Sequence, residues 1–462
     1  MISLLPFAVL FFAQLQVDAK DIIEKSYVAH GGVHGTDSLK VAFKFSCPDR
    51  INEGQSFVPE APFDTYITDD EVWIDRPAKK TVYKTRGTLA GGFEETHVIS
   101  LNNGRGYDVN TKNRSYNEIA SIPNPRQLSQ NFLLKTALAN PSKLKYIGEV
   151  NAAYHVMLDT VNIFINKNTL LVERIERTLY EPQSGKGTLS IIFEDYQKAG
   201  NAMIPGKYIT VKKNLVYGTI TNTYTLSNIR AEFSIPQDLF LLPEGYTMRH
   251  HGTKDCEISQ LGDGLFLVES IEGNGGAYQI LVAEFTDYLL ITEAPLDIAT
   301  TRRVLEKISD RFPSKPVRYL VQSHSHYDHI GGIIGYTDRN VTVVSTKDAV
   351  GVINRMSKAF GRDPKKLKIS TVKDKVTIKD GTNSCIVYNI GPNPHSREML
   401  VTWFPKQKIL YQADVWEPGA KDQPTHADFI KKIKRLNINI ETVVPAHGDI
   451  VRGEEIAELV RQ

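Results

Sequence analysis

Cysteine is scarce in this chain, with only Cys47, Cys256 and Cys385 among 462 residues. The three are widely spaced and form no Cys-x-x-Cys pair, which argues against a cysteine-based zinc site or a redox dithiol. We expect them to be buried as small apolar side chains, with one disulfide as the alternative if the chain matures in an oxidising compartment. The sequence does not select the pair.

A strong charge imbalance is also absent. The 55 Lys and Arg residues nearly cancel the 53 Asp and Glu residues, which leaves a formal net charge of +2. Such a balance gives no overall field that would attract nucleic acid or an anionic membrane. The short basic runs KKIKR (431–435) and PKKLK (364–368) lack the interleaved aromatic residues that would stack on bases. We therefore expect no nucleic-acid partner.

Only the N-terminus carries a long apolar run. Residues 2–13 are apolar almost throughout, and VDA (17–19) supplies small residues at the spacing of a cleavage site. The run is shorter than the roughly 20 residues that span a bilayer. We predict a signal peptide at residues 1–19, although no Lys or Arg precedes the run, and a secreted or periplasmic mature chain without a transmembrane span. A membrane-anchored N-terminus is the alternative.

The length of the chain predicts two domains. Residues 20–245 contain alternating polar and apolar stretches, such as KYITVKKNLVYGTITNTYTLSNI, separated by Asn, Asp and Gly turns. This pattern predicts a mostly antiparallel β domain. The stretch from NIFINKNTLLVERIE to NAMIPGKYITV resembles the curved half-barrels of periplasmic lipoprotein carriers.

The rhythm of the sequence changes after a predicted linker at residues 246–255. From 256 to 462, short apolar strands such as VRYLVQS and KILYQA alternate with amphipathic helical patterns such as IATTRRVLEKISDRF. Near-continuous apolar strands alternating with helices predict sheets that are covered by helices. The second domain is therefore expected to be of the α/β class.

Histidine is sparse as well, with twelve in the chain, yet three histidines and one aspartate fall within HSHYDH at residues 324–329. The segment follows VRYLVQS (317–323), which we predict to be a buried strand. Residues two apart in an extended segment face the same side, so we expect His324, His326 and Asp328 to project into one cleft. By the same alternation, Tyr327 should face away.

The segment DHIGG is expected to open a helix at this point, with Asp328 near its N-cap and His329 directly after it. Crowding three imidazoles and a carboxylate together without a partner would cost several kcal/mol. Imidazole nitrogen and carboxylate oxygen are good ligands for a divalent metal such as zinc. The cluster therefore predicts a metal site.

Three later motifs each follow a predicted strand. GPNPHSREM supplies His395, LYQADVW supplies Asp414 and VVPAHGD supplies His447. Together with HSHYDH, and in this order, the motifs resemble the signature of the metallo-β-lactamase superfamily. The resemblance extends over about residues 256–462 and implies a four-layer αββα sandwich with the metal cleft at one sheet edge.

The same resemblance implies two metal sites. The first would be held by His324, His326 and His395 and the second by Asp328, His329 and His447, with Asp414 bridging. It also implies two Zn²⁺ ions, with iron or manganese as alternatives, and a shared hydroxide that Asp328 orients as the catalytic carboxylate. Upstream, where the superfamily often has aspartate, this chain has Glu293, which is either a supporting acceptor for a ligand histidine or an exposed strand end.

The chain is thus expected to be a hydrolase of a small-molecule ester, lactone, thioester or related bond. One group of true β-lactamases typically has cysteine at the position of Asp414, so the aspartate favours the other hydrolases of the superfamily. Hydrolysis of a β-lactam amide is one alternative. The other is a non-catalytic lipid- or ligand-binding protein with a metal site.

Overall fold

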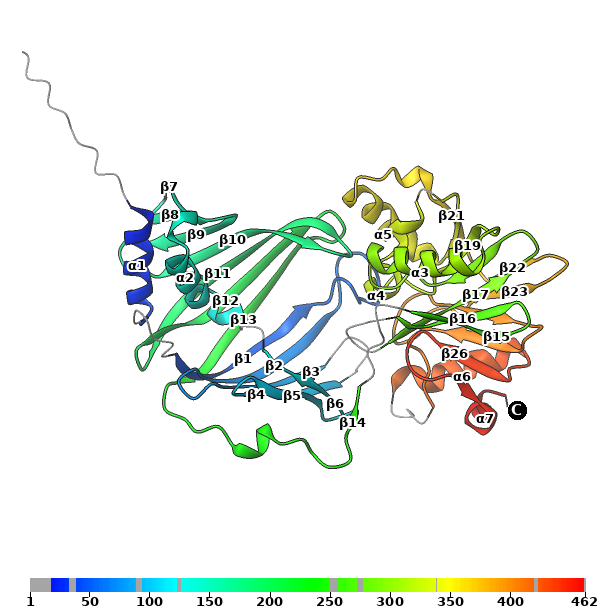
Figure 1. The fold of residues 1–462 in the computed structure, drawn as a ribbon, viewed down its shortest axis with the longest axis horizontal. Helices are drawn as coiled ribbons and strands as arrows, with labels where there is room; N and C mark the ends of the chain where they lie inside the picture. The colour runs from blue at the N-terminus through cyan, green and yellow to red at the C-terminus, as the bar shows by residue number, and fades with distance from the viewer. Residues whose placement is uncertain are drawn as a thin grey trace, which may run out of the picture.

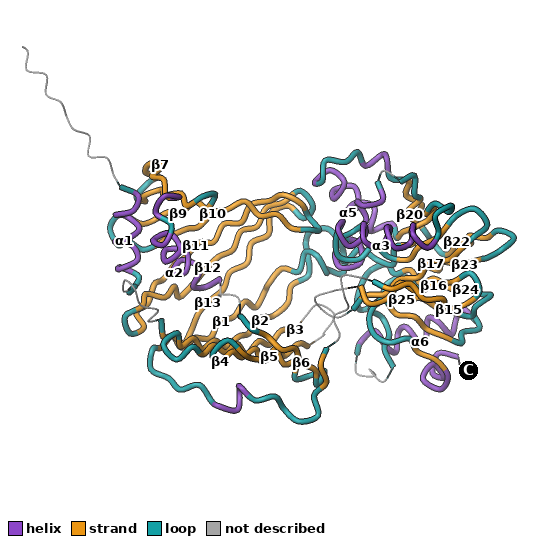
Figure 2. The backbone as a smooth tube through the Cα atoms, viewed as in Figure 1, coloured by secondary structure: helices purple, strands orange, loops and turns teal. Residues whose placement is uncertain are grey.

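A computed structural model describes residues 18–32, 39–88, 94–122, 126–249, 256–271, 277–337, 339–418 and 423–460. The predicted signal peptide up to residue 17 and residues 250–255 of the predicted linker lie outside these described residues. Figure 1 shows a large curved sheet beside a layered α/β part, and Figure 2 shows that strand dominates the former.

Fourteen strands form the large sheet in the order β14-β6-β5-β4-β3-β2-β1-β13-β12-β11-β10-β9-β8-β7. Neighbouring strands are antiparallel, except that β14 runs parallel to β6. The strands are β1 (Lys40–Ile51), β2 (Thr65–Asp75), β3 (Lys80–Thr88), β4 (Glu94–Asn102), β5 (Arg105–Asn110), β6 (Ser115–Ile119), β7 (Leu144–Val150), β8 (Ala153–Leu158), β9 (Val161–Asn166), β10 (Val172–Glu181), β11 (Gly185–Ala199), β12 (Ala202–Asn214), β13 (Gly218–Arg230) and β14 (Thr247–Met248). The predicted β-rich first part is confirmed, and β14 extends its sheet into the predicted linker.

Helices α1 (Ala19–Ala29) and α2 (Ser129–Ala139) pack against one face of this sheet. The alternation of the strands explains the packing, because every second side chain of a strand faces the helices. Ile22 and Ile23 of α1 and Leu134 of α2 share one buried cluster with Val41 and Phe43 of β1. Burial of these apolar side chains stabilises the sheet from this side.

The second part contains two further sheets. The seven-stranded sheet comprises β15 (Glu257–Gly262), β16 (Leu265–Ile271), β17 (Tyr278–Glu284), β18 (Leu289–Thr292), β19 (Val317–Val321), β20 (Thr342–Ser345) and β21 (Lys368–Thr371) in chain order. The six-stranded sheet comprises β22 (Lys375–Lys379), β23 (Ser384–Asn389), β24 (Leu400–Phe404), β25 (Ile409–Gln412), β26 (Thr442–Pro445) and β27 (Val451–Arg452). The helices are α3 (Ile298–Arg311), α4 (Tyr327–Ile330), α5 (Lys347–Ala359), α6 (Pro424–Leu436) and α7 (Ala457–Val460).

Three buried clusters show how these elements are layered. Strand β16 directs Phe266 and Val268 toward a cluster shared with α3 and α5, and it directs Leu265 and Leu267 toward a cluster between the two sheets. A third cluster joins the outer face of the second sheet to Phe429 of α6. The order of layers is therefore helix, sheet, sheet, helix. This confirms the predicted αββα sandwich.

The loop between β1 and β2, residues 52–64, connects the large sheet to the sandwich. The backbone N–H of Arg397 donates to the carbonyl of Phe57 at 3.0 Å. The guanidinium of Arg355 on α5 donates to the carbonyls of Val216 at 2.6 Å and Pro59 at 2.9 Å. The two parts of the chain are thus joined by hydrogen bonds as well as by the chain itself.

All three cysteines are buried as thiols. This agrees with the expectation of small apolar side chains and leaves no disulfide. None of the helices in the described ranges combines the length and the apolar character that crossing a bilayer requires.

Candidate metal centre

Loops that leave the ends of strands bring the predicted ligands together. Strand β19 ends at Val321, just before the HSHYDH segment. His395 lies between β23 and β24, Asp414 follows β25 and His447 follows β26. Because β18–β19 and β25–β26 are parallel neighbours, the loops that follow them meet at one edge of the sandwich. The prediction that each motif follows a strand is confirmed.

The alternation predicted for residues 324–329 holds only as far as His326. Helix α4 begins at Tyr327, with His326 in the extended conformation at its N-cap position. Asp328 and His329 therefore reach the centre from the first turn of a helix, which confirms the prediction of Asp328 near the N-cap, although the helix begins one residue earlier than predicted. The ring of Tyr327 packs against Gly54 in the loop between β1 and β2.

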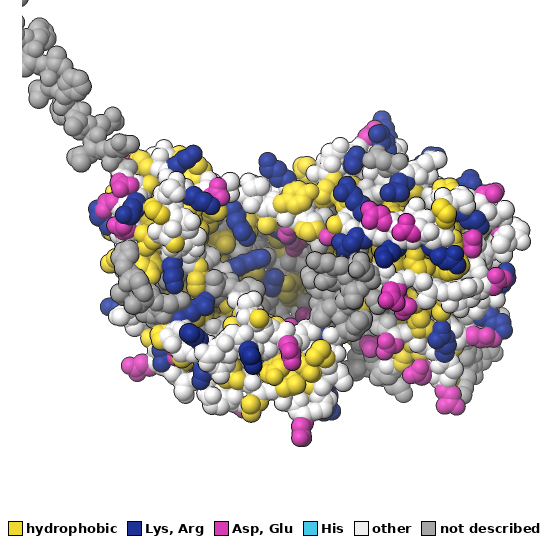
Figure 3. Space-filling view, in the orientation of Figure 1, with side chains coloured by type: hydrophobic (Ala, Val, Ile, Leu, Met, Phe, Trp, Pro, Cys, Tyr) yellow, Lys and Arg dark blue, Asp and Glu magenta, His cyan; other side chains and the backbone are white. Residues whose placement is uncertain are grey.

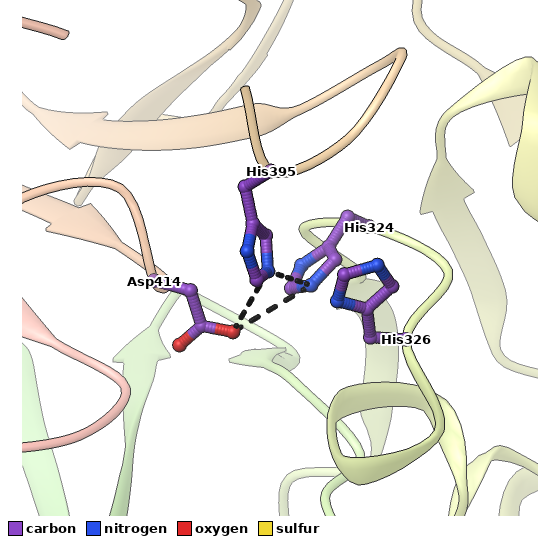
Figure 4. A group of neighbouring side chains, drawn as sticks. All are labelled: His324, His326, His395 and Asp414. Atoms are coloured by element: carbon purple, nitrogen blue, oxygen red, sulfur yellow. Dashed lines mark hydrogen bonds and ion pairs between the residues drawn. The ribbon is translucent and has the colours of Figure 1, made fainter. Parts of the chain in front are cut away.

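The first group of potential ligands is shown in Figure 4. It consists of His324, His326, His395 and Asp414, whose ligand atoms all lie within 4.8 Å of one another. The Nε2 atoms of His324 and His395 are 3.3 Å apart. Oδ2 of Asp414 lies 3.3 Å from Nε2 of His395 and 3.6 Å from Nε2 of His324.

The second group is formed by Asp328, His329, His447 and again Asp414. Nε2 of His329 lies 2.7 Å from Oδ2 of Asp414 and 3.3 Å from Nε2 of His447. Oδ1 of Asp414 lies 3.3 Å from Nε2 of His447. Asp414 thus lies between the two groups, and its φ of +60° places it in the left-handed region, which strains a residue other than glycine.

The pKa values of the histidines in this cluster depend on burial and on the neighbouring imidazoles and carboxylates. Burial lowers the pKa of His326 to about 3, helped by the neighbouring imidazole of His395. Burial also opposes protonation of His329, but the carboxylates of Asp414 and Asp328 outweigh it and raise its pKa to about 10. Imidazoles that lie close together disfavour each other's protonation, so their nitrogen lone pairs stay available to bind a metal cation.

Glu293 is a buried carboxylate beside the ligand histidine His329. It is 1% exposed, so it is not a surface strand end, and Oε2 lies 3.8 Å from Nδ1 of His329. Its carboxylate accepts hydrogen bonds from the side chain of Gln322 at 2.6 Å and from the backbone of Ser323 at 3.2 Å. Burial raises the pKa of Glu293 to about 7. Ser323 also contacts Nδ1 of His324 through its hydroxyl at 2.8 Å.

Both carboxylate oxygens of Asp328 have a partner outside the two groups. The hydroxyl of Tyr278 donates to Oδ2 at 3.2 Å, and the side-chain amide of Gln55 donates to Oδ1 at 3.4 Å. Burial and the charge of Asp328 raise the pKa of Tyr278, so its hydroxyl stays protonated and acts as a donor. Tyr278 also pairs with His447 through the backbone, and their ring centroids lie 4.1 Å apart.

Two cavities adjoin the centre. One, of about 550 Å³, opens at Asp414 and His447 and is also lined by Trp416. The other, of about 340 Å³, is lined by Gln55 and Tyr327 and by residues of the large sheet, including Arg50 and Lys212. In Figure 3 the surface is hollowed between the sheet and the sandwich, with Lys and Arg side chains in the hollow. A small molecule therefore has room beside the ligand groups.

Sequence reasoning missed the residues that support the ligands. Gln322 and Ser323 stand directly before HSHYDH, so their position could have suggested this role. Gln55, Ser56 and Tyr278 lie far from the motif in sequence, and no local pattern marks them.

The residues that are present fit a metal. Their donor set contains imidazole nitrogens and carboxylate oxygens, which suit zinc and related ions. Four Nε2 atoms lie in close pairs, and Nδ1 of buried His326 has no hydrogen-bond partner within the described part of the chain. A cation between these atoms would satisfy lone pairs that otherwise face one another.

Known proteins share this sequence pattern. Residues 299–447 match the sequence model of the metallo-beta-lactamase superfamily. A metallo-beta-lactamase type 2 of Bacillus sp. (strain 170) is 24% identical over 250 residues, which cover 50% of this chain and 88% of the relative. The 2,4-dinitroanisole O-demethylase subunit alpha of Nocardioides sp. (strain JS1661) is 29% identical over 195 residues, which cover 40% of this chain and 53% of that protein.

A similar solved structure is that of the metallo-beta-lactamase FIM-1 from Pseudomonas aeruginosa in its mono-zinc form. It has a TM-score of 0.36 and 19% identity, and the match covers 44% of this chain and 92% of that one.

The αββα layers and the two His/Asp groups define the class of a metal-dependent hydrolase. Residues 299–447 carry a domain of the metallo-β-lactamase superfamily, as the resemblance predicted.

Proposed function

We propose that the chain is a binuclear zinc hydrolase of a small-molecule ester, lactone, thioester or related bond. The observation that carries this proposal is the position of Asp414 within both ligand groups. A shared carboxylate allows two ions to sit side by side, as in binuclear hydrolases. Bound zinc would polarise the scissile bond and supply a nucleophile from water near neutral pH.

The candidate ligands have distinct proposed roles. His324, His326 and His395 would hold one ion, and Asp328, His329 and His447 would hold the other. Asp328 would also orient the attacking water and take up its proton. The contacts of Asp328 with Tyr278 and Gln55 support this role, because they fix the direction of both carboxylate oxygens.

Asp414 favours a bond other than a β-lactam amide. A cysteine at this position would resemble one group of β-lactamases, and neither cysteine of the second part is near the centre. Cys256 lies in the cluster with α3 and α5, and Cys385 lies in the cluster between the sheets. Hydrolysis of a β-lactam amide is the second candidate, and the relatives named metallo-beta-lactamase type 2 favour it.

Measurements on the purified chain and on one variant test the proposal. Elemental analysis should give close to two zinc ions per chain, and chromogenic esters, lactones, thioesters and cephalosporins should then be compared as substrates. Asp328→Ala should abolish turnover of the preferred substrate. Turnover that survives this substitution with the ions still bound would refute the assigned role of Asp328. Lipid that co-purifies with an inactive, metal-bound protein would instead support the non-catalytic binding protein.

We also propose that the protein is exported after removal of residues 1–19 and that residues 20–245 and 256–462 are its two domains. The apolar run and the small residues that follow it support export. N-terminal sequencing of the protein from the periplasm or the medium should begin at Lys20. A full-length chain in the cytoplasm would contradict this.

A further inference from the structure

Three consecutive residues of the large sheet's β1–β2 loop contact three consecutive residues of the metal motif. The carbonyl of Gly54 accepts from the backbone N–H of Tyr327 at 2.9 Å. The side chain of Gln55 donates to Asp328, and the carbonyl of Ser56 lies 3.2 Å from Nε2 of His326. These contacts link residues 270 or more positions apart in the sequence.

The loop is held in shape by its own hydrogen bonds. The backbone N–H of Asp64 donates to the hydroxyl of Ser56 at 2.8 Å, and the carboxylate of Asp64 accepts from the N–H of Phe57 at 2.6 Å. The N–H of Asn52 donates to the carbonyl of Asp64 at 2.9 Å. Asp64 therefore closes the loop on both sides of Ser56, so that the loop meets the sandwich in a defined conformation.

We propose that Gln55 and the backbone carbonyl of Ser56 are positioning groups for the metal ligands. The inference rests on the proposed function, since it assumes that the two groups hold ions. A carbonyl oxygen can only accept a hydrogen bond, so its contact with Nε2 requires that this nitrogen of His326 carries the proton. The lone pair of His326 is then on Nδ1, which has no hydrogen-bond partner among the described residues. Ser56 thereby selects the tautomer and fixes the ring plane.

Gln55 acts on the other ligand group. Tyr278 already donates to Oδ2 of Asp328, which also lies 3.6 Å from Nε2 of His329, so without Gln55 the carboxylate could rotate about its Oδ2 contacts. The amide of Gln55 on Oδ1 prevents this rotation. Gly54 allows the loop to come this close, because a Cβ at this position would lie 2.8 Å from Cδ1 of Tyr327. The large sheet is thus part of the metal centre.

The two contacts predict separable effects on the two ions. Gln55→Ala removes support from Asp328 alone, so it should weaken the ion held by Asp328, His329 and His447. Asp64→Asn replaces the carboxylate that accepts from the N–H of Phe57 by a neutral amide, which weakens this bond beside Ser56. The variant should therefore weaken the ion held by His326 as well. Loss of a group that orients a metal ligand typically costs about 10- to 100-fold in affinity, and we expect the lower end for Gln55 because its contact is long.

The experiment titrates the metal-free full chain with Zn²⁺ against a chromophoric chelator, and it records the visible spectrum of the cobalt-substituted protein. The matched control is Gln183→Ala, which makes the same chemical change in the same cavity without a contact to the ligands in the described structure. We expect one weakened ion in Gln55→Ala, two in Asp64→Asn and none in Gln183→Ala, with altered cobalt bands only in the first two. Circular dichroism should show that all three variants fold.

Folded Gln55→Ala and Asp64→Asn proteins that bind both ions within about twofold of the parent chain would overturn the inference while leaving the proposed function in place. A parent chain that binds no zinc would overturn both.

Discussion

Asp414 lies 2.7 Å from Nε2 of His329 through Oδ2, and the same oxygen also faces His324 and His395 of the other ligand group. One carboxylate therefore contacts imidazoles of both groups. Asp414→Asn preserves the shape of the side chain but removes its charge and one of its acceptor oxygens. We expect affinity for at least one ion to fall by 10-fold or more, so that the zinc content after dialysis approaches one per chain.

The control for this substitution is Asp449→Asn. Asp449 lines the same cavity as Asp414 but is exposed and belongs to neither ligand group. Its zinc content should stay at that of the parent chain. Two tightly held ions in Asp414→Asn would contradict a bridging role for Asp414.

Glu293 is the buried carboxylate that faces the far side of the His329 ring. Glu293→Gln retains the size of the side chain but removes the negative charge that favours a protonated Nδ1 and a free Nε2 on His329. We expect about 10-fold weaker binding of the ion held by His329, with the other ion unchanged, in the same chelator competition. Glu284→Gln, whose side chain pairs with Lys315 at the end of β17, should leave both affinities unchanged.

The clustering of the candidate ligands could be predicted from the sequence because the four motifs are local and each follows an apolar strand. A strand end fixes where a loop begins, and parallel neighbours place such loops at a common edge. The orientation of Asp328 was only partly foreseen, since the start of α4 at Tyr327 ends the alternation on which the prediction relied. A short helix that begins inside a motif leaves little periodicity to detect.

Contacts between the two parts of the chain could not be predicted in this way. The contact of Gln55 with Asp328 depends on how the large sheet docks on the sandwich, and nothing in the sequence near either residue encodes that arrangement. The order of the fourteen strands is equally a property of long-range pairing. Alternation identifies strands but does not say which strand lies beside which.

Asp70 on β2 gives the large sheet a dependence on pH. The side chain is 9% exposed, and burial raises its pKa to about 7, whereas the carboxyl of an unfolded chain titrates near pH ~4. The folded state therefore holds this proton more tightly, so the stabilisation is complete below pH ~4 and is lost as the pH rises to about 7. Asp70→Asn stays neutral throughout. We expect the variant to match the parent near pH ~4 and to be more stable by roughly 1–3 kcal/mol near pH ~8.

Urea denaturation at several pH values, followed by a spectroscopic signal that reports unfolding of the large sheet, measures this difference in stability. Asp69→Asn is the matched control, because Asp69 is the residue next to Asp70 on the same strand and its side chain is exposed. The control should show no comparable gain at high pH. If the difference between Asp70→Asn and the parent does not change with pH, Asp70 does not carry a raised pKa.

Arg355 joins the two parts of the chain through three hydrogen bonds, to the carbonyls of Val216 and Pro59 and to the carboxylate of Glu60 at 3.1 Å. Arg355→Met keeps much of the aliphatic stem but leaves the two carbonyls without this donor, at a cost of about 1–3 kcal/mol. We expect thermal unfolding to occur at a lower temperature or to split into two transitions, because the contacts that couple the large sheet to the sandwich are weakened.

The control is Arg397→Met, which removes an ion pair with Asp348 inside the sandwich. The Arg397 side chain is 53% exposed, so this variant should change the transition little. Since Pro59 belongs to the loop that also carries Gln55, weaker zinc binding should accompany the loss of coupling in Arg355→Met alone. Unchanged unfolding and unchanged zinc affinity would show that the loop keeps its place without Arg355.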